Sequence, residues 1–509
     1  MPPHRNLSSQ LMIAVARAQQ RLKISLLIIG FFLASLRGVF AYASCEDKDA
    51  EALKRIDEDA VCELITVPLD HNAPDAATID LRLITLPATS RNPAADPMVF
   101  LAGGPGQSAI QAAPFWLRSH RALRSDRAFI FLDQRGTGGS ASLACADDLE
   151  PLFAKDFEWW MTQEAAIEAQ QEGLQACLKK LPYSPSHFTT AAAVRDLAAV
   201  LDHLGVAKAN LFGVSYGTRM ALAFLREHED RVRSVLLDAV APHSMVIPAR
   251  VVEDARAALD HVFTACDKST ACSARFPDLR ATLEIARQQL EAADGPISVV
   301  DPLTGETVEF VTWPDMLSNI LRAGLYSREL IRLFPLAIER GSQGQFDSLI
   351  TVASMLAQES PRDLSLGMMA SVLCAEDMRR LPPMDEFAKR NPLVDSMAPI
   401  CEFWPSEPAP ERLFEPVTSD VPALLLSGQF DPITPPRYAI EIEPNLSHSH
   451  HVIIPGGAHG VSGLGCIPEV IESFIEDPVS RDLDLDCTDD IQIAPFFLSP
   501  SGAFGGAYD

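Results

Sequence analysis

Short apolar runs alternate with segments of helical spacing along this chain, and that alternation limits the possible folds more than any other feature. Four early apolar runs are typical of strands: Leu64–Val67, Ile79–Leu86, Met98–Ala102 and Ala128–Leu132. A helical pattern follows over Thr189–Leu204, where Thr190 is placed to cap the amino end. Because repeated strand–helix units build a mostly parallel sheet, the sequence predicts an α/β fold.

The alternation is interrupted between about His243 and Pro416. This stretch is mainly helical, contains several prolines and four cysteines, and lacks strand–helix units. The alternation then returns in four segments: Val421–Ser427, Arg437–Ile442, His451–Ile454 and Pro468–Ile475. We therefore predict a first core segment at residues 44–242, an inserted helical cap at 243–416, and a second core segment at 417–509 that ends in a loose tail.

A G-x-S-x-G pentapeptide, Gly213–Gly217, connects a predicted strand at Asn210–Val214 to a predicted helix from Ser215 to about His228. A strand, a tight turn and a helix are the context that a nucleophile elbow requires. The turn holds the serine in a strained conformation and lifts its hydroxyl clear of the sheet, while the flanking glycines let strand and helix approach closely. Ser215 is therefore the predicted nucleophile.

Two polar residues follow late apolar strands and fit the partners that a nucleophilic serine needs. A serine hydroxyl requires a general base, and the base requires a carboxylate to orient it. Asp431 follows the run at Leu424–Leu426, and His459 follows the run at Ile453–Ile454. Because the carboxyl ends of parallel strands share one edge of a sheet, we predict a catalytic triad of Ser215, Asp431 and His459 in that chain order.

A glycine-rich run, Gly103–Gly106, follows the predicted strand at Met98–Ala102 and allows bare backbone to approach a ligand. Together with the backbone N–H of Tyr216, it fits the oxyanion hole that acyl transfer needs. The run lacks the Walker lysine and the full dinucleotide spacing, which excludes a phosphate-binding loop. After the next strand, Asp133 and Arg135 stand two apart in a glycine-rich turn, which favours a structural ion pair over a catalytic role.

These motifs together resemble the prolyl aminopeptidase and tripeptidyl aminopeptidase group of α/β-hydrolases. The resemblance spans about residues 60–480 and is carried by these segments: Gly103–Gly106, Asp133–Ser140, Gly213–Gly217, the strand end at Asp431, and Gly457-Ala458-His459-Gly460. It implies the α/β-hydrolase fold, with a mostly parallel central sheet and an inserted, mainly helical cap. It also implies that Gly104 and Tyr216 are the oxyanion donors.

The resemblance further implies a substrate. Cys374–Asp377 is similar to the acidic cap segment of the secreted members, which makes Glu376 the candidate for binding the α-ammonium of a peptide with a free N-terminus. Prolyl aminopeptidases usually carry a histidine where this chain has Ala102, and this difference argues against a strict preference for proline. The implied protein is an exported aminopeptidase that releases N-terminal residues or short, tripeptide-like fragments through an acyl-enzyme on Ser215, with no metal or cofactor.

Two other functions remain open. The same triad serves esterases and lipases that act on small or hydrophobic esters, because fold and triad do not fix the substrate. The third possibility is a binding protein that has lost catalysis, and the complete set of serine, acid and histidine argues against it.

The amino-terminal segment and the cysteines predict export. Basic residues up to Lys23 precede the uncharged apolar run Ile24–Leu36, and Ala41–Ala43 has the small-x-small pattern of a cleavage site. Residues 1–43 are therefore a predicted signal peptide, with an uncleaved membrane anchor as the alternative. All ten cysteines follow this segment, which predicts disulfides in a secreted or periplasmic protein. Pairing between cysteines that are neighbours in the sequence is the simplest arrangement.

The net charge limits the partners. At a formal charge of −26, the chain repels phosphate backbones and anionic lipid surfaces. The sequence therefore excludes nucleic acid as a partner, and we expect no stable membrane partner after signal cleavage. The cysteines and histidines also lack the spacing of a zinc site.

Overall fold

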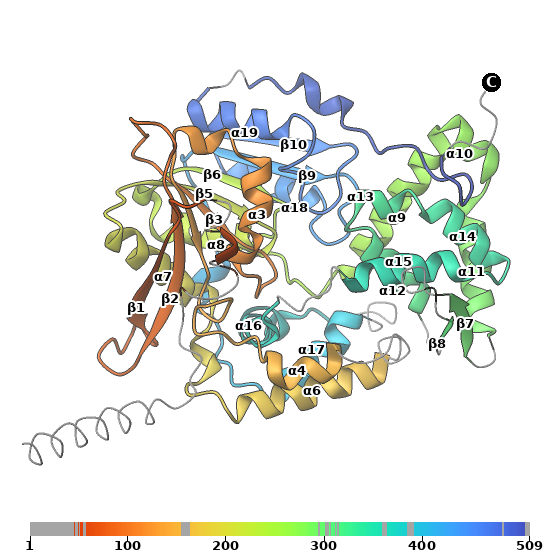
Figure 1. Cartoon of the computed structure of the whole chain (residues 1–509), viewed down its shortest axis with the longest axis horizontal. Coiled ribbons are helices and arrows are strands. Elements are labelled where there is room, and N and C mark those ends of the chain that lie inside the picture. The colour runs from red at the N-terminus through yellow and green to blue at the C-terminus, as the bar shows by residue number, and fades with distance from the viewer. Residues whose placement is uncertain are drawn as a thin grey trace, which may run out of the picture. The chain divides into compact units, whose positions relative to one another are not determined.

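An eight-stranded sheet organises the computed structural model of this protein (Figure 1). The structure describes residues 45, 49, 51–53, 57–153, 163–293, 296–300, 305, 307–310, 312, 315–358, 364–383, 391–480 and 483–503. The strands are β1 (Val61–Pro68), β2 (Thr78–Leu86), β3 (Met98–Leu101), β4 (Phe129–Leu132), β5 (Ala209–Val214), β6 (Val232–Asp238), β9 (Ala423–Gly428) and β10 (Ser449–Ile454). Each strand predicted from an apolar run is present, and β1 begins ahead of the predicted Leu64.

The sheet is mostly parallel, as the strand–helix alternation predicts. The strand order is β1-β2-β4-β3-β5-β6-β9-β10. The β1–β2 and β2–β4 pairs are antiparallel, and the other neighbours run parallel. Phe212 of β5 pairs with Phe100 of β3 on one side and with Leu236 of β6 on the other. The carboxyl ends of β5, β6, β9 and β10 therefore lie next to one another along one edge.

Helices cover both faces of this sheet. They include α3 (Ala109–Ser119), α7 (Thr190–His203), α8 (Tyr216–Glu227), α18 (Arg437–Ile442) and α19 (Ile467–Glu476). Successive strand side chains point to opposite faces. Phe100 therefore belongs to the apolar cluster of α3 and α19, and Leu101 to that of α7 and α8. Thr189, rather than the predicted Thr190, caps α7, because its side chain accepts the N–H of Ala192 at 3.3 Å.

The chain between β6 and β9 is long and mostly helical. Its helices are α9 (Val251–Lys268), α10 (Thr270–Arg275), α11 (Leu279–Glu291), α12 (Met316–Gly324), α13 (Arg328–Ile331), α14 (Phe334–Ser342), α15 (Asp347–Gln358), α16 (Leu366–Val372) and α17 (Pro392–Phe403). A π-helical turn, Leu373–Asp377, follows α16. No described residue of this stretch joins the central sheet. A small antiparallel pair, β7 (Ile297–Val300) with β8 (Thr307–Phe310), is an addition that the sequence pattern does not predict.

The helices between β6 and β9 share an apolar core with two loops of the sheet. Phe263 of α9 and Phe334 of α14 belong to this core, and so do Phe430 and Ala458. Phe430 and Ala458 directly precede Asp431 and His459. The helical segment therefore packs against the two loops that carry the predicted acid and base.

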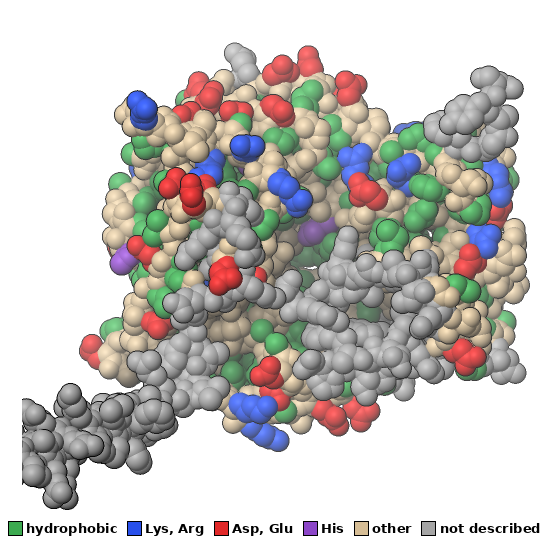
Figure 2. Space-filling view, in the orientation of Figure 1, with side chains coloured by type: hydrophobic (Ala, Val, Ile, Leu, Met, Phe, Trp, Pro, Cys, Tyr) green, Lys and Arg blue, Asp and Glu red, His purple; other side chains and the backbone are tan. Residues whose placement is uncertain are grey.

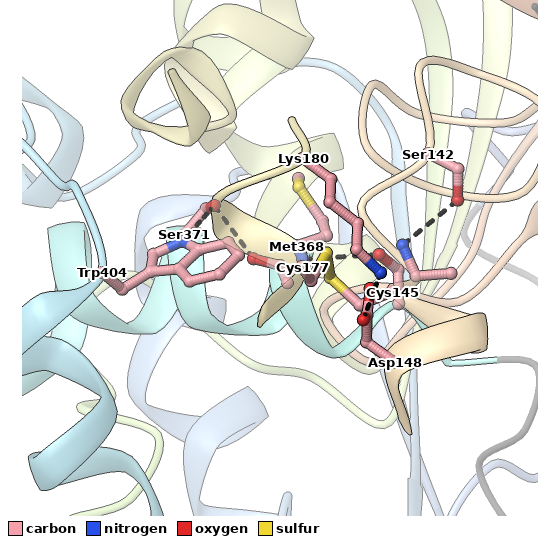
Figure 3. Close-up of a disulfide and its surroundings, with 11 residues drawn as sticks. Ser142, Cys145, Asp148, Cys177, Lys180, Met368, Ser371 and Trp404 are labelled. Carbon is pink, nitrogen blue, oxygen red and sulfur yellow. Dashed lines mark hydrogen bonds and ion pairs between the residues drawn. A yellow bond between two sulfur atoms is a disulfide. The ribbon is translucent and has the colours of Figure 1, made fainter. Parts of the chain in front are cut away.

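A second pair of helices, α4 (Ala146–Phe153) and α6 (Gln163–Leu178), follows β4 and is joined by the Cys145–Cys177 disulfide (Figure 3). Lys180 donates to Asp148 at 2.6 Å beside this disulfide. Leu149 and Leu174 share an apolar cluster with α17 and with Trp404. This helical pair therefore packs against the segment between β6 and β9, an arrangement that the sequence pattern does not predict.

All ten cysteines form disulfides between neighbours in the sequence, as the simplest pairing predicts. The pairs are Cys45–Cys62, Cys145–Cys177, Cys266–Cys272, Cys374–Cys401 and Cys466–Cys487. The predicted signal peptide at residues 1–43 lies outside the described residues. Within the part of the chain that the structure describes, no helix is both long and apolar enough to cross a membrane.

Candidate active site

Ser215 stands at the turn between β5 and α8 with φ 56° and ψ −123°, a conformation that L-residues rarely adopt. Its backbone N–H donates to the carbonyl oxygen of Asp238 at 2.9 Å. Only glycine fits on either side of the turn. A Cβ on Gly213 would lie 2.4 Å from the carbonyl oxygen of Gly217, and one on Gly217 would lie 2.0 Å from that of Leu101. The pentapeptide thus forms the strained turn that a nucleophile elbow requires.

Asp431 and His459 form a buried pair at the ends of β9 and β10. The Nδ1 atom of His459 lies 2.9 Å from Oδ2 of Asp431. Asp431 has no exposed surface, and its Oδ1 accepts the N–H groups of Ile433 and Thr434. The hydroxyl of Thr434 donates to Oδ2 at 2.7 Å. These donors fix the carboxylate, which in turn fixes the orientation of the imidazole.

The electrostatics of this pair suit a general base. Burial lowers the pKa of His459, but the charge and hydrogen bond of Asp431, with the charge of Asp238, outweigh burial and hold the pKa above its usual 6.5. Burial raises the pKa of Asp431, but His459 and the N–H groups of Thr434 and Ile433 outweigh it and hold the pKa below its usual range. With Nδ1–H directed at Asp431, the Nε2 atom of His459 is the nitrogen that can take a proton.

The loop after His459 lies against the nucleophile turn. The backbone N–H groups of Val461 and Ser462 donate to the carboxylate of Asp238, whose own carbonyl accepts the Ser215 N–H. Ser215, Asp431 and His459 therefore lie at the ends of nearby parallel strands on one edge of the sheet, where the sequence predicts them. Their catalytic roles stay predictions, which the geometry supports.

The glycine-rich run lies against the nucleophile. A Cβ on Gly103 would lie 3.1 Å from Cβ of Ser215, so the backbone here approaches the serine closely. Gly104 has φ +107°, which only glycine adopts without strain. The side-chain hydroxyl of Tyr216 is buried and lies 2.7 Å from Oγ1 of Thr190. The oxyanion roles of Gly104 and Tyr216 stay predictions.

Glu376 lies in the π-helical turn with no exposed surface. The backbone N–H and the hydroxyl of Thr190 each donate to one of its carboxylate oxygens at 2.8 Å. Nη1 of Arg219 is 3.9 Å from Oε2 of Glu376 and 2.8 Å from Oδ2 of Asp377. In this arrangement a substrate ammonium would reach Glu376 only if the turn moved. The amine-binding role of Glu376 stays a prediction.

Two residues of the site carry no clear signal in the sequence. The ring of Tyr326 lies edge-on against His459, with the ring centroids 5.0 Å apart. Tyr326 follows α12, more than 100 residues before the histidine, so only the folded chain reveals the contact. The contact of Thr434 with Asp431 has a weak signal in the sequence. An aspartate side chain often accepts the backbone N–H groups two and three residues later in a turn.

Asp133 and Arg135 do not pair with each other, which corrects the predicted structural pair. Asp133 instead accepts two hydrogen bonds from the buried guanidinium of Arg82, and Arg135 donates to both carboxylate oxygens of Asp196. Both residues are fully buried. Among the described residues, no group of three or more His, Cys, Asp or Glu side chains could hold a metal ion.

Comparisons with known proteins agree with this geometry. Residues 96–265 match the family described as "alpha/beta hydrolase fold", and residues 387–487 match the family described as "TAP-like protein". Serine protease Hip1 of Mycobacterium tuberculosis is 24% identical over 450 residues, which cover 82% of this chain and 85% of that protein.

Two further relatives match shorter stretches. The tripeptidyl aminopeptidase of Streptomyces coelicolor is 29% identical over 209 residues, 39% of this chain and 38% of that protein. The proline iminopeptidase of Neisseria meningitidis is 27% identical over 153 residues, 30% of this chain and 34% of that protein. The chain is therefore an α/β hydrolase with a TAP-like region, and serine protease Hip1, tripeptidyl aminopeptidase and proline iminopeptidase are among its distant relatives.

Proposed function

We propose that this α/β hydrolase is a serine peptidase that cleaves peptides through an acyl-enzyme on Ser215. The observation that carries the proposal is the strained serine turn on the same sheet edge as the buried Asp431–His459 pair. Ser215 Oγ attacks the substrate carbonyl while Nε2 of His459 takes its proton. Asp431 stabilises the imidazolium that forms, and the backbone N–H groups of Gly104 and Tyr216 bind the developing oxyanion.

The second half of the reaction uses the same groups. His459 returns its proton to the leaving amine, and the carbon–nitrogen bond breaks to leave an ester on Ser215. A water molecule then loses a proton to His459 and attacks this ester, and His459 gives that proton to Ser215 Oγ as the ester bond breaks, which releases the acyl product and restores the serine. The closed cycle needs only residues of this chain and water.

The substrate proposed here is a peptide with a free N-terminus, cut to release one residue or a short fragment. The named relatives support this proposal, because all three carry peptidase names and one of them matches over 82% of the chain. The ring of Tyr326, which comes from the segment between β6 and β9, lies edge-on beside His459, so this segment borders the proposed site. Esterase activity is the competing outcome.

The first test asks whether Ser215 is the nucleophile. A fluorophosphonate probe should label the wild type on Ser215, and Ser215→Ala should lose turnover by a factor on the order of 10⁴–10⁶ while it keeps its fold. Near-wild-type activity of Ser215→Ala would contradict the proposal. A panel of aminoacyl, tripeptidyl and acyl-ester substrates then separates peptidase from esterase, because an esterase would turn over only the esters efficiently.

We also propose that the protein is exported with cleavage after residue 43. Five disulfides indicate an extracytoplasmic location, because thiols stay reduced in the cytosol. Mass spectrometry of protein from the native host should find a mature chain that begins near Ser44 and contains no free thiol. An intact Met1 together with ten free thiols would contradict both expectations.

A further inference from the structure

Asp238 is a fully buried carboxylate that the catalytic cycle above does not use. It ends β6, the strand that lies between the nucleophile strand β5 and the acid strand β9. Its carbonyl oxygen accepts the N–H of Ser215 at 2.9 Å. Its side chain faces the loop after His459, where the N–H of Val461 is 3.0 and 2.9 Å from the two carboxylate oxygens and that of Ser462 is 2.8 Å from Oδ2. One residue thus contacts the backbone of both the nucleophile turn and the histidine loop.

The contacts of the Asp238 side chain suit an anion. Val461 and Ser462 donate to it through their backbone N–H groups, and the side chain of Ser462 adds a further hydrogen bond, whereas a protonated carboxyl would need an acceptor for its own proton. Burial holds the pKa of Asp238 above its usual range, and the N–H groups of Val461 and Ser462, the side chain of Ser462 and the charge of His459 oppose that rise. The carboxylate form therefore gains stabilisation from the same loop that it holds.

The histidine loop passes close over the ends of β5 and β6. Gly460 has φ +80°, the left-handed region that favours glycine. A Cβ at this position would lie 3.9 Å from Oδ2 of Asp238 and 4.0 Å from Cγ1 of Val214. Because Asp238 is hydrogen-bonded to Val461, Ser462 and Ser215, its displacement would disturb the histidine loop and the nucleophile turn together.

We propose that Asp238 is a positioning residue of the triad, which holds the loop of His459 against the nucleophile turn and presents a second buried negative charge to the imidazolium. The proposal rests on the proposed acyl-enzyme on Ser215. When His459 takes the serine proton, a cation forms in a site from which water is largely excluded, and nearby fixed anions stabilise it. Asp431 does so through Nδ1, and Asp238 does so from the neighbouring strand end.

Few titratable groups face His459, so a pH profile of activity can show which of them affects its pKa. They are the carboxylates of Asp431 and Asp238 and the phenol of Tyr326. A phenol is neutral near pH 7, so the two carboxylates set the charge around the imidazole. An anion favours protonation of His459, and its removal must therefore lower the pKa of His459.

The test compares Asp238→Asn with a matched variant, Asp96→Asn, in the full-length protein. Asp96 precedes β3 at the opposite edge of the sheet, where its partly buried carboxylate binds Arg127 and Asn210. Two quantities are measured from about pH 5 to about pH 9: the rate of fluorophosphonate inactivation, and kcat/KM for a tripeptidyl amide. The pH values are spaced closely enough to resolve a midpoint shift of roughly 0.2 pH unit, well below the shift expected from one nearby charge. Active-site titration normalises each rate to the folded, competent fraction.

In Asp238→Asn, the midpoint of the acid limb should move down by roughly 0.5–1 pH unit. The plateau rate per active site should fall ~10-fold or more, mostly in kcat, because the loop is less well held and the imidazolium is less stabilised. Asp96→Asn should change neither quantity. If Asp238→Asn does not fold, Asp238→Ser removes the same charge and gives the same readout.

A normal midpoint and a normal rate per active site in the Asp238 variant would overturn the proposal. A lower count of active sites with an unchanged midpoint would also overturn it, because Asp238 would then only stabilise the fold. Failure of the proposed function gives a different result. In that case the wild type is not labelled on Ser215, and the present inference falls with it.

Discussion

A chain of buried hydrogen bonds runs from Tyr216, the residue after the predicted nucleophile, to the π-helical turn. The hydroxyl of Tyr216 lies 2.7 Å from Oγ1 of Thr190, which donates to Glu376 at 2.8 Å. The guanidinium of Arg219 closes the network through Asp377. Tyr216 is the predicted oxyanion donor, so these contacts connect the turn at Leu373–Asp377 to the catalytic edge.

Glu376→Gln distinguishes this connecting role from amine binding. If the contacts in the structure represent its role, kcat/KM should fall by similar factors for free-amine and for N-blocked peptides, because both depend on the same oxyanion geometry. Paired assays on one preparation check this, and the pairing also controls for misfolding. A loss confined to free-amine peptides, worth roughly 2–5 kcal/mol, would instead support Glu376 as the anchor of the substrate ammonium.

The titration of Glu376 predicts how stability depends on pH. Burial, opposed by Arg219, raises the pKa of Glu376 from 4.5 to about 7. A raised carboxyl pKa means that the folded state holds the proton more tightly than the unfolded state does. The contribution of Glu376 to the free energy of unfolding is therefore full below about pH 4.5 and is lost as the pH rises towards 7. The loss should reach ~3 kcal/mol of unfolding free energy.

Urea unfolding at pH 5 and at pH 8, in the wild type and in Glu376→Gln, measures this contribution. The wild type should lose stability relative to the variant as the pH rises, since glutamine does not titrate. An identical change in both proteins would show that Glu376 does not titrate in this range.

The residues at strand ends could be predicted from the sequence, and those brought together across the fold could not. Ser215, Asp431 and His459 each follow an apolar run, and parallel strands place their carboxyl ends on one edge. Asp238 ends a run of the same kind and shows the same signal. The contact of Tyr326 with His459 depends on how the segment between β6 and β9 packs, which no local pattern specifies.

At the scale of elements, local patterns predicted the strands but not every helical insertion. Strand limits follow from apolar runs flanked by turns, and α18 has the predicted limits, Arg437–Ile442. The pair α4 and α6 lacks such a signal, because its buried side chains pack against α17 and Trp404, far away in the sequence. The β7–β8 pair is likewise defined by a partner strand rather than by a long apolar run.

The disulfide that joins α4 and α6 should contribute more stability than the shortest one. Cys145 and Cys177 are 32 residues apart, and Cys266 and Cys272 are 6 apart. Because a longer closed loop removes more entropy from the unfolded chain, the double change Cys145→Ser with Cys177→Ser should cost about 3–4 kcal/mol. The control change Cys266→Ser with Cys272→Ser should cost about 2 kcal/mol.

Thermal unfolding of the two double variants under non-reducing conditions measures the difference. The variant without Cys145–Cys177 should melt at the lower temperature. The opposite order would mean that local packing, rather than loop length, decides what each disulfide contributes.

At the scale of the whole molecule, acidic groups outnumber basic ones, 68 to 42. Figure 2 shows both kinds interspersed over the face that it draws. Repulsion among like charges destabilises a compact chain. At 0.1 M salt, the repulsion between exposed charges more than about 10 Å apart is largely screened. The melting temperature should therefore rise by a few degrees between about 10 mM and about 150 mM NaCl. A fall would show that surface ion pairs, which salt weakens, outweigh the repulsion.

The order of strands along the chain has a consequence for synthesis. The turn of the predicted nucleophile follows β5, whereas the predicted acid and base follow β9 and β10, which come after the long helical segment. A growing chain that has already made the serine turn still lacks both partners, and the core that packs around Phe430 and Ala458 is also incomplete. If Ser215, Asp431 and His459 form the proposed triad, a truncated product of translation that ends before His459 lacks the base and should be inactive toward the peptides around it.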